Sequence, residues 1–175
     1  MNSTPALKAD ALKAAIAIIP CSREKAWDDV AITGPQPARL AYRSPLFMAA
    51  LRWADAVAER TLILSALHGL VDADDLIAER YDVTFSRPGD PVVSTQTLYR
   101  QARDFGLFAH ENVICALPDD YVERLTVAFA GTRTRCTNVL AGIDLADLAA
   151  MRHAVEIALA AAQKGDEFDG DQGPA

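Results

Sequence analysis

Residues 14–25 read Ala-Ala-Ile-Ala-Ile-Ile-Pro and then Cys-Ser-Arg-Glu-Lys, an apolar run that stops abruptly at a polar cluster. An unbroken apolar run of this length is typical of a parallel strand that is covered by helices on both faces. The pattern recurs in residues 60–70, where Arg-Thr-Leu-Ile-Leu-Ser-Ala is followed by Leu-His-Gly-Leu. Because the carboxyl ends of parallel strands meet at one edge of a sheet, both polar clusters are predicted to face one pocket.

The other segments alternate between strand and helix patterns. Strands are expected at 14–20, 60–66, 112–117 and 135–140, and helices at 45–57, 95–108 and 119–129. This order predicts an α/β fold, a single three-layer domain with a mainly parallel four-stranded sheet and helices on both faces. Residues 67–95 form a long, turn-rich connection, which in a compact domain indicates a functional or a disordered loop.

Capping residues mark two helix starts. Ser44 before Pro45 predicts an N-cap followed by proline at the first helical position. Asp144, with Asp147 three residues later, resembles a capping box that opens the last helix. The buried face of that helix is expected to carry Leu145, Leu148, Val155 and Leu159.

Length and composition favour one domain at residues 14–163. The chain has 175 residues, of which 51% are hydrophobic, enough for one well-filled core. Residues 1–13 form an N-terminal segment without the features of a signal peptide, and the acidic residues 164–175 are expected to be a disordered tail. No apolar stretch reaches the roughly 20 residues that cross a bilayer, so a cytoplasmic protein without a membrane partner is expected.

Charge and cysteine content narrow the function classes. A net charge of −7 argues against a protein that grips duplex DNA through its phosphates alone. A locally basic cleft formed by Arg23, Lys25, Arg39 and Arg43 stays open, as does the alternative that these are ordinary solvated side chains. The three cysteines have no C-x-x-C spacing, which argues against a disulfide framework or a zinc site.

The first polar cluster carries candidate binding groups. Backbone amides around Cys21 and Ser22 are placed to form an anion-binding nest. Lys25 is a compact cation that can hold a phosphate, stabilise a departing base, or act as a nucleophile if it is desolvated. The alternatives are a small buried thiol at Cys21 and a solvated ammonium at Lys25.

The second polar cluster centres on His68, which follows the strand-end residue Ser65 and precedes Gly69. Histidine exchanges protons near neutral pH, and glycine permits a tight turn or a close backbone approach to a ligand. A capping or core imidazole is the alternative for His68. The chain has neither a Walker A loop nor a G-x-G-x-x-G motif, which argues against P-loop hydrolysis and dinucleotide redox chemistry.

Two tyrosine-containing motifs complete the candidates. Tyr42 beside Arg43 suits stacking on a planar base together with contact to a phosphate. Asp82, which follows Tyr81 in the long connection, is a candidate to orient water. The alternatives are that Tyr42 packs against the helix start and that Asp82 caps a turn.

Together these motifs resemble a widespread family of small bacterial and phage proteins. The resemblance rests on Pro20-Cys21-Ser22 with Lys25, Tyr42-x-Ser44-x-x-Phe47, Leu64-Ser65-Ala66-x-His68-Gly69-Leu70-Val71 and Tyr81-Asp82. That family is similar to the Pro-Cys-Ser domain of archaeosine synthase and, more distantly, to the uracil-DNA glycosylase-like superfamily, with phage-defence DNA glycosylases nearby. Here Lys25 is followed by Ala26-Trp27-Asp28, where the archaeosine synthase pattern has Pro-Tyr.

The resemblance implies a uracil-DNA glycosylase-like fold and an N-glycosidase that releases a modified nucleobase from DNA, in defence against phage with hypermodified cytosine. His68, Lys25 or the amides after Cys21 would stabilise the departing base, Asp82 or Glu24 would position water, and Tyr42 or Trp27 would face the base. The substrate-binding set is Cys21, Ser22, Arg23, Tyr42, Arg43, Ser44, Ser65 and Gly69. No cofactor or metal is required. An RNA base-modifying or base-transferring enzyme and a non-catalytic nucleotide or nucleic-acid sensor remain alternatives, with DNA favoured over RNA or a free nucleotide as partner.

Overall fold

One mixed sheet forms the centre of the computed structural model, which describes residues 14–144 and 147–167. Its strand order is β4-β3-β1-β6-β7, with bounds β1 Ala14–Pro20, β3 Ala58–Ser65, β4 Gly69–Asp72, β6 Asn112–Cys115 and β7 Arg135–Asn138. β1 pairs in parallel with β3 and β6, β6 pairs in parallel with β7, and β4 runs antiparallel to β3. The architecture is therefore α/β with a mostly parallel sheet.

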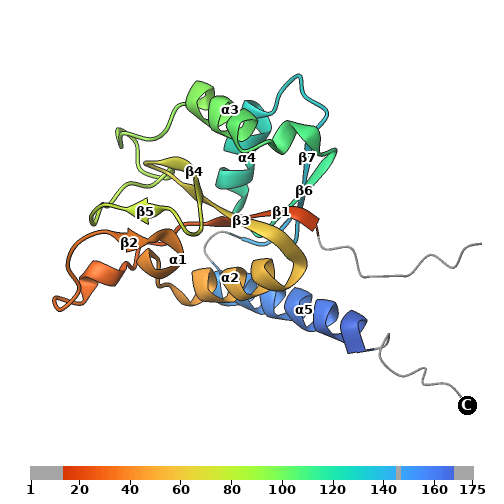
Figure 1. Ribbon diagram of the computed structural model, residues 1–175, viewed down its shortest axis with the longest axis horizontal. Helices are drawn as coiled ribbons and strands as arrows, with labels where there is room; N and C mark the ends of the chain where they lie inside the picture. The colour runs from red at the N-terminus through yellow and green to blue at the C-terminus, as the bar shows by residue number, and fades with distance from the viewer. Residues whose placement is uncertain (1–13, 145–146, 168–175) are drawn as a thin grey trace, which may run out of the picture.

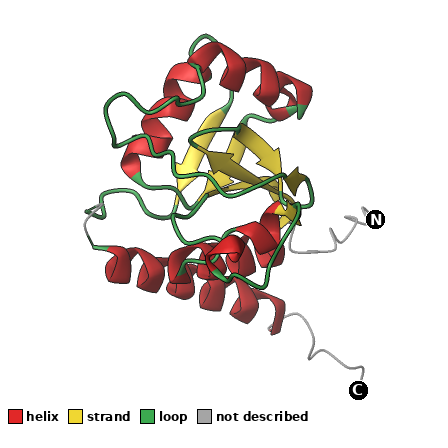
Figure 2. Cartoon of the chain, turned by 90° about the vertical axis from the view of Figure 1, so that its left-hand side faces the viewer, coloured by secondary structure: helices red, strands yellow, loops and turns green. Residues whose placement is uncertain are grey.

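Helices cover both faces of the sheet, as Figures 1 and 2 show. The helices are α1 Ala38–Ala41, α2 Pro45–Val57, α3 Thr95–Asp104, α4 Asp119–Ala128 and α5 Leu148–Glu167. α2 and α5 pack on one face, and α3 and α4 pack on the other. Two short 3-10 turns lie at Ala26–Asp28 and Leu107–Ala109. Among the described residues, no helix is both long and apolar enough to cross a membrane.

The side chains of β1 alternate between two cores, which explains why the whole strand is apolar. Ala17 and Ile19 pack toward α2 and α5, whereas Ile16 and Ile18 pack toward α3 and α4. Successive side chains of a strand point to opposite faces, so a strand between two helical layers must be apolar on both. The predicted strand at 14–20 is thereby confirmed to the residue.

The predicted sheet lacked one strand. β4 lies inside the connection that was expected to be a loop, and it makes the sheet five-stranded rather than four-stranded. Gly69 has a φ of +75° and lets the chain reverse so that β4 pairs with β3. A small second sheet joins β2 Gln36–Pro37 to β5 Leu76–Ile77 in antiparallel fashion. These three strands have only two to four residues each, which is too few for a periodic pattern to be detected in a turn-rich sequence.

The start of α5 differs from the prediction. Asp147 caps this helix, because its carboxylate accepts a hydrogen bond from the Ala150 amide at 2.8 Å, and the helix begins at Leu148. Leu148 is 61% exposed instead of buried, whereas Val155 is buried and Leu159 packs partly against the core. The prediction for Leu145 lies outside the described residues. α5 continues to Glu167, into the segment expected to be a tail, and residues 1–13 and 168–175 are likewise outside the description.

Candidate functional site

The candidate site lies at the carboxyl end of β1, where the sheet order changes direction. From β1 the chain proceeds to β3 on one side, and later returns to β6 on the other side. Open α/β sheets bind ligands in the crevice outside such a switch point. Two adjoining hollows occupy this place, one of about 260 Å³ and one of about 640 Å³. Cys21, Ser22, Arg23, Thr84 and Tyr121 line both hollows.

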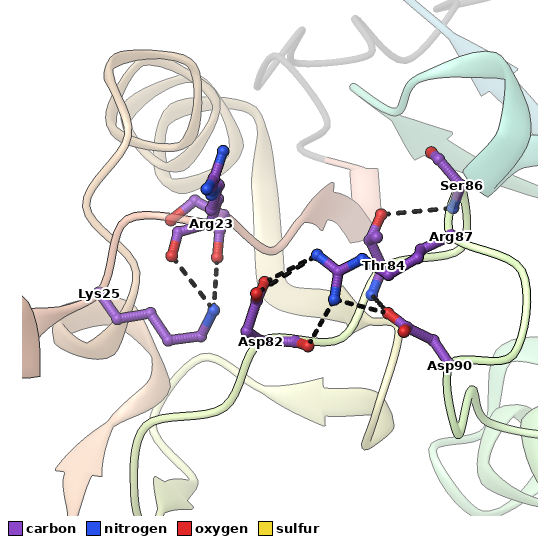
Figure 3. A network of polar contacts seen from close by, with 8 residues as sticks. Arg23, Lys25, Asp82, Thr84, Ser86, Arg87 and Asp90 are labelled. Atoms are coloured by element: carbon purple, nitrogen blue, oxygen red, sulfur yellow. Dashed lines mark hydrogen bonds and ion pairs between the residues drawn. The ribbon is translucent and has the colours of Figure 1, made fainter.

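Lys25, the candidate cation of the first polar cluster, lines the smaller hollow. Lys25 is only 4% exposed, and its Nζ donates to the backbone oxygen of Ser22 at 2.8 Å and to that of Arg23 at 3.4 Å (Figure 3). The same Nζ lies 4.2 Å from the centre of the Tyr81 ring and 5.7 Å from that of Tyr42. Lys25 is therefore fixed in place, and the alternative of a solvated lysine is wrong.

Burial changes the proton affinity of Lys25. Desolvation lowers the pKa of its ammonium group, and the nearby guanidinium of Arg80 acts in the same direction. Cys21 and the carboxylates of Asp82 and Asp28 oppose this shift without reversing it. A buried lysine with a lowered pKa beside a hollow is typical of functional sites, although structural ion networks show the same shift.

Asp82 lies on the wall of the smaller hollow with Lys25, and it also has a cationic partner. Its carboxylate is 3.3 Å from the guanidinium of Arg87, which also lies 3.4 Å from Asp90 (Figure 3). The carboxylate of Asp90 in turn accepts the Thr84 amide at 2.8 Å, which ties this loop together. The hollow therefore combines three cationic side chains, those of Arg23, Lys25 and Arg87, with one carboxylate on its wall.

Tyr81 is a central residue that the sequence analysis did not include among the site residues. Its hydroxyl is 2.6 Å from the hydroxyl of Tyr42 and 2.7 Å from that of Ser65, and its ring also contacts Lys25 and His68. Burial raises the pKa of both phenols, so their hydroxyls stay protonated. Tyr81 thus joins the segment after β1, the end of β3 and the C-terminal end of α1. The sequence feature that could have identified Tyr81 as a site residue is its position directly before Asp82 in the quoted motif.

His68 reaches this cluster through Tyr81. The two rings meet edge to face, with centroids 4.9 Å apart, while the imidazole stays largely exposed. Among the described residues, the lining of the smaller hollow does not include His68. Lys25, His68 and Tyr42 were expected to face one pocket, and this is correct only for Lys25, which lines the smaller hollow. Tyr42 is fully buried, and His68 packs against Tyr81 outside the lining.

A histidine titration tests this arrangement. Partial burial and the positive charge of Lys25 both lower the pKa of His68, so we expect its proton NMR titration to have a midpoint below 6.5. Lys25→Met removes the charge but not the burial, and should move the midpoint upward without restoring it fully. Lys164→Met, at an exposed position of α5, should leave it unchanged. A midpoint above 6.5 in the unmodified protein would contradict the packing seen here.

Several predicted substrate-binding residues are occupied by structural contacts. The Ser22 hydroxyl donates to the Glu24 oxygen at 2.6 Å and accepts the amides of Arg43 and Ser44 at 3.0 and 3.3 Å. The Ser44 hydroxyl caps α2 by accepting the Phe47 amide, which confirms the predicted cap. These two hydroxyls therefore fix the loop through backbone contacts.

Tyr42 and Ser65 cannot contact a substrate directly because both side chains are fully buried. The expectation that Tyr42 stacks on a base is wrong for this reason, and its role is to support Tyr81. The Ser65 hydroxyl accepts the amides of Leu67 and His68 at 3.2 and 3.0 Å, which closes the turn after β3.

Gly69 and the remaining candidates also have structural explanations. The space beside Gly69 is taken by the Gln101 side chain, whose Nε2 donates to the His68 oxygen at 2.8 Å and whose Oε1 accepts the Leu70 amide at 3.0 Å. The group that approaches the Gly69 backbone closely is therefore the Gln101 side chain and not a ligand. Trp27 donates from Nε1 to the Gly34 oxygen at 2.9 Å.

The proposed basic cleft is only partly assembled. Arg39 is engaged elsewhere, at 2.6 Å from Asp74 and 3.3 Å from Asp55. Arg43 is exposed and its Nε donates to the Leu40 oxygen at 3.4 Å. Arg23 is exposed and borders both hollows. Within residues 14–144 and 147–167, no three His, Cys, Asp or Glu side chains gather as they would around a metal ion.

The larger hollow extends from Cys21 toward the starts of α2 and α5. The Cys21 thiol lies 3.4 Å from the Tyr121 hydroxyl, and both groups stand on the wall that the two hollows share. Pro45 and Leu46 of α2 and Leu148 of α5 give the larger hollow an apolar surface. Cys21 is half-buried, so it is neither a core thiol nor a freely solvated one.

Comparisons with known proteins place this site within a shared region. A family model described as "Family of unknown function (DUF6884)" matches residues 16–151. The "Uncharacterized protein YfjM" of Bacillus subtilis (strain 168) is 36% identical over 99 residues, which are 57% of this chain and 66% of the relative. The match thus spans just under two thirds of that relative. No solved structure matches the chain significantly. Lys25, Tyr81 and Asp82 all lie inside the region that the family model matches.

Proposed function

We propose that this chain, which belongs to the family of unknown function DUF6884, is an N-glycosidase that releases a modified nucleobase from DNA. The observation that carries the proposal is the buried ammonium of Lys25 in a small hollow at the sheet's switch point, with the carboxylate of Asp82 on the same wall. The motif resemblance to the archaeosine synthase domain and to uracil-DNA glycosylases supports the same reaction class. Defence against phage with hypermodified cytosine is the proposed setting.

Lys25 supplies the charge that this reaction needs. When the bond between the sugar C1′ and the base nitrogen breaks, its electron pair passes to the base, and positive charge develops on the sugar. A fixed ammonium in a partly dry hollow stabilises the developing negative charge, because it needs no reorganisation and little water screens it. Nζ is held by hydrogen bonds to the oxygens of Ser22 and Arg23 and by the Tyr81 ring, whose centre lies 4.2 Å away, so its charge is fixed beside the hollow.

Asp82 completes the reaction on the sugar side. Water adds to C1′ with its oxygen, and the proton that it loses must pass to a base such as a carboxylate. Asp82 is placed for this role on the wall of the hollow, and Arg87 orients it. Glu24 borders the larger hollow instead, so Asp82 is the better candidate of the two carboxylates. The departing base takes up a proton from solvent or from Lys25.

The test is base release from phage DNA that carries modified cytosines, compared with unmodified DNA of the same sequence. We expect free modified base by mass spectrometry and, in equal amount, abasic sites that break in alkali. Asp82→Asn should lower the rate by at least tenfold, whereas Asp104→Asn, an exposed carboxylate on α3 that is also paired with an arginine, should leave it unchanged.

The other functions predict different outcomes of this assay. Base exchange on RNA without abasic DNA would support a base-transferring enzyme. Saturable binding of the modified DNA with no released base would support a sensor, and would refute the glycosidase proposal. The sensor is the second candidate function, because the Asp82–Arg87 pair also suits binding of a polar base without reaction.

A further inference from the structure

The proposed base release uses only the smaller hollow, and the larger hollow beside it has no function assigned so far. Its volume of about 640 Å³ lies in the range of sites for ligands of several hundred daltons, whereas the smaller hollow of about 260 Å³ is suited to a single base. The two share a wall that includes Cys21, Arg23 and Tyr121. A ligand that fills the smaller hollow can therefore continue directly into the larger one.

The surface of the larger hollow suits a planar ring. Pro45 and Leu46 at the start of α2 and Leu148 and Ala149 at the start of α5 line it, together with the Tyr121 ring from α4. Leu148 is 61% exposed although it is a large apolar side chain. An exposed leucine on the wall of a hollow indicates a binding surface more strongly than one on a convex surface, because a bound ring can cover it there.

The charges of the larger hollow are placed for a phosphate between two nucleotides. Arg23 borders both hollows, and among the described residues its guanidinium makes no ion pair. Arg152 lies on the wall of the larger hollow only, with Glu156 as a partner at 3.5 Å. Arginine binds phosphate through a planar pair of N–H groups. Glu24 on the same wall opposes an anion, so a phosphate must be held on the arginine side.

We infer that the larger hollow binds the nucleotide next to the one held beside Lys25, with Arg23 contacting the phosphate between them. The substrate is then a nucleic acid strand and not a free nucleotide. This inference rests on the proposed function only for the identity of the nucleotide in the smaller hollow. It assigns Leu148 and Tyr121 to the neighbouring base, since base stacking on apolar and aromatic side chains does not depend on sequence.

The test measures binding and not base release. The probes are the nucleoside 5-hydroxymethyl-deoxycytidine, which has no phosphate, and the trinucleotide that carries a thymidine on each side of the same base, titrated into the full chain by calorimetry. We expect the trinucleotide to bind at least 10-fold more tightly. Arg23→Ala and Leu148→Glu should each reduce this advantage to less than about 3-fold with little effect on binding of the nucleoside, and Glu24→Gln should increase it.

Controls separate this subsite from general charge effects. Arg133→Ala removes an arginine from a different surface hollow and should leave the length dependence unchanged. The dependence of trinucleotide affinity on salt should become shallower by about 0.7 in the logarithmic slope when Arg23 is removed, as expected for one phosphate contact on a single strand. The melting temperatures of the variants show whether they fold.

Two binding results would overturn the inference. One is equal affinity for the nucleoside and the trinucleotide, and the other is loss of affinity for both in Arg23→Ala. Failure of the proposed function gives a different result, because a protein that only binds strands would show the full length dependence and release no base. Conversely, equal base release from a free nucleotide and from a strand would refute the subsite and leave the glycosidase in place.

Discussion

Replacing Lys25 by methionine is expected to lower base release by about 10²–10³-fold, the usual effect of removing one charge-stabilising donor from an active site. Methionine keeps the length and apolar character of the lysine stem but lacks the ammonium group. We expect a folded protein with a lower melting temperature, because the backbone oxygens of Ser22 and Arg23 lose the hydrogen bonds from Nζ. The measurement is the single-turnover rate on modified phage DNA, with the melting temperature of the variant beside it.

The matched control is Lys164→Met, the same substitution at an exposed position near the end of α5. It should leave both the rate and the melting temperature unchanged. A Lys25→Met protein that is folded at the assay temperature and still releases base at the original rate would exclude Lys25 from the reaction. If the variant instead fails to fold, Lys25→Gln removes the charge, keeps N–H donors for the Ser22 and Arg23 oxygens, and allows the same comparison.

The pH dependence distinguishes an electrostatic role of Lys25 from a nucleophilic one. Burial lowers its pKa below the usual 10.5, so the ammonium form is lost at a lower pH than in an exposed lysine. If the ammonium acts by its charge, base release falls as pH rises through that lowered pKa. If the neutral amine attacks C1′, the rate instead rises over the same range, and borohydride reduces the imine formed with the opened sugar to a stable protein–DNA adduct. We expect the falling limb and no adduct.

Much of the fold follows from the sequence because buried parallel strands and capped helices leave strong local signals. The apolar run of β1 is set by burial on both faces, and Ser44-Pro45 fixes the start of α2 through a side-chain cap. β4 was not predicted because its four residues obtain their strand geometry from pairing with β3, which no local pattern reports. The start of α5 was misplaced because Asp144 and Asp147 are both chemically suited to a cap, and only the backbone path selects between them.

The sequence predicted where the candidate site lies, but not which of its residues line the hollow and which only support the fold. Strand ends brought the two polar clusters together, and Lys25 and Asp82 reached the same hollow. The sequence does not indicate which polar side chains form hydrogen bonds with the backbone. Ser22 and Ser65 accept backbone amides in the folded chain, and this alone distinguishes them from serines that bind a ligand. Tyr81 was overlooked because its four contacts come from segments far apart in the chain.

Gly69→Ala is expected to destabilise the protein by about 2–5 kcal/mol, a large effect for a single added methyl. Two costs combine. Gly69 has a φ of +75°, which costs an alanine about 1–2 kcal/mol. The added Cβ would also overlap Oε1 of Gln101 and lie 3.0 Å from Cγ2 of Val93. The glutamine can swing away, but it then loses its hydrogen bonds to the His68 oxygen and the Leu70 amide, at about 0.5–1.5 kcal/mol each.

Two further variants separate these costs in urea unfolding. Gly106→Ala has nearly the same backbone strain, with a φ of +76° and no atom within 4 Å of the new Cβ, so it should lose only about 1–2 kcal/mol. In the double variant Gly69→Ala with Gln101→Ala, the second change removes hydrogen bonds that the first has already broken. Its loss should therefore be smaller than the sum of the two single losses by at least about 1 kcal/mol. Equal losses for Gly69→Ala and Gly106→Ala would show that Gln101 does not hold the turn, and strict additivity would show that the two residues do not contact each other.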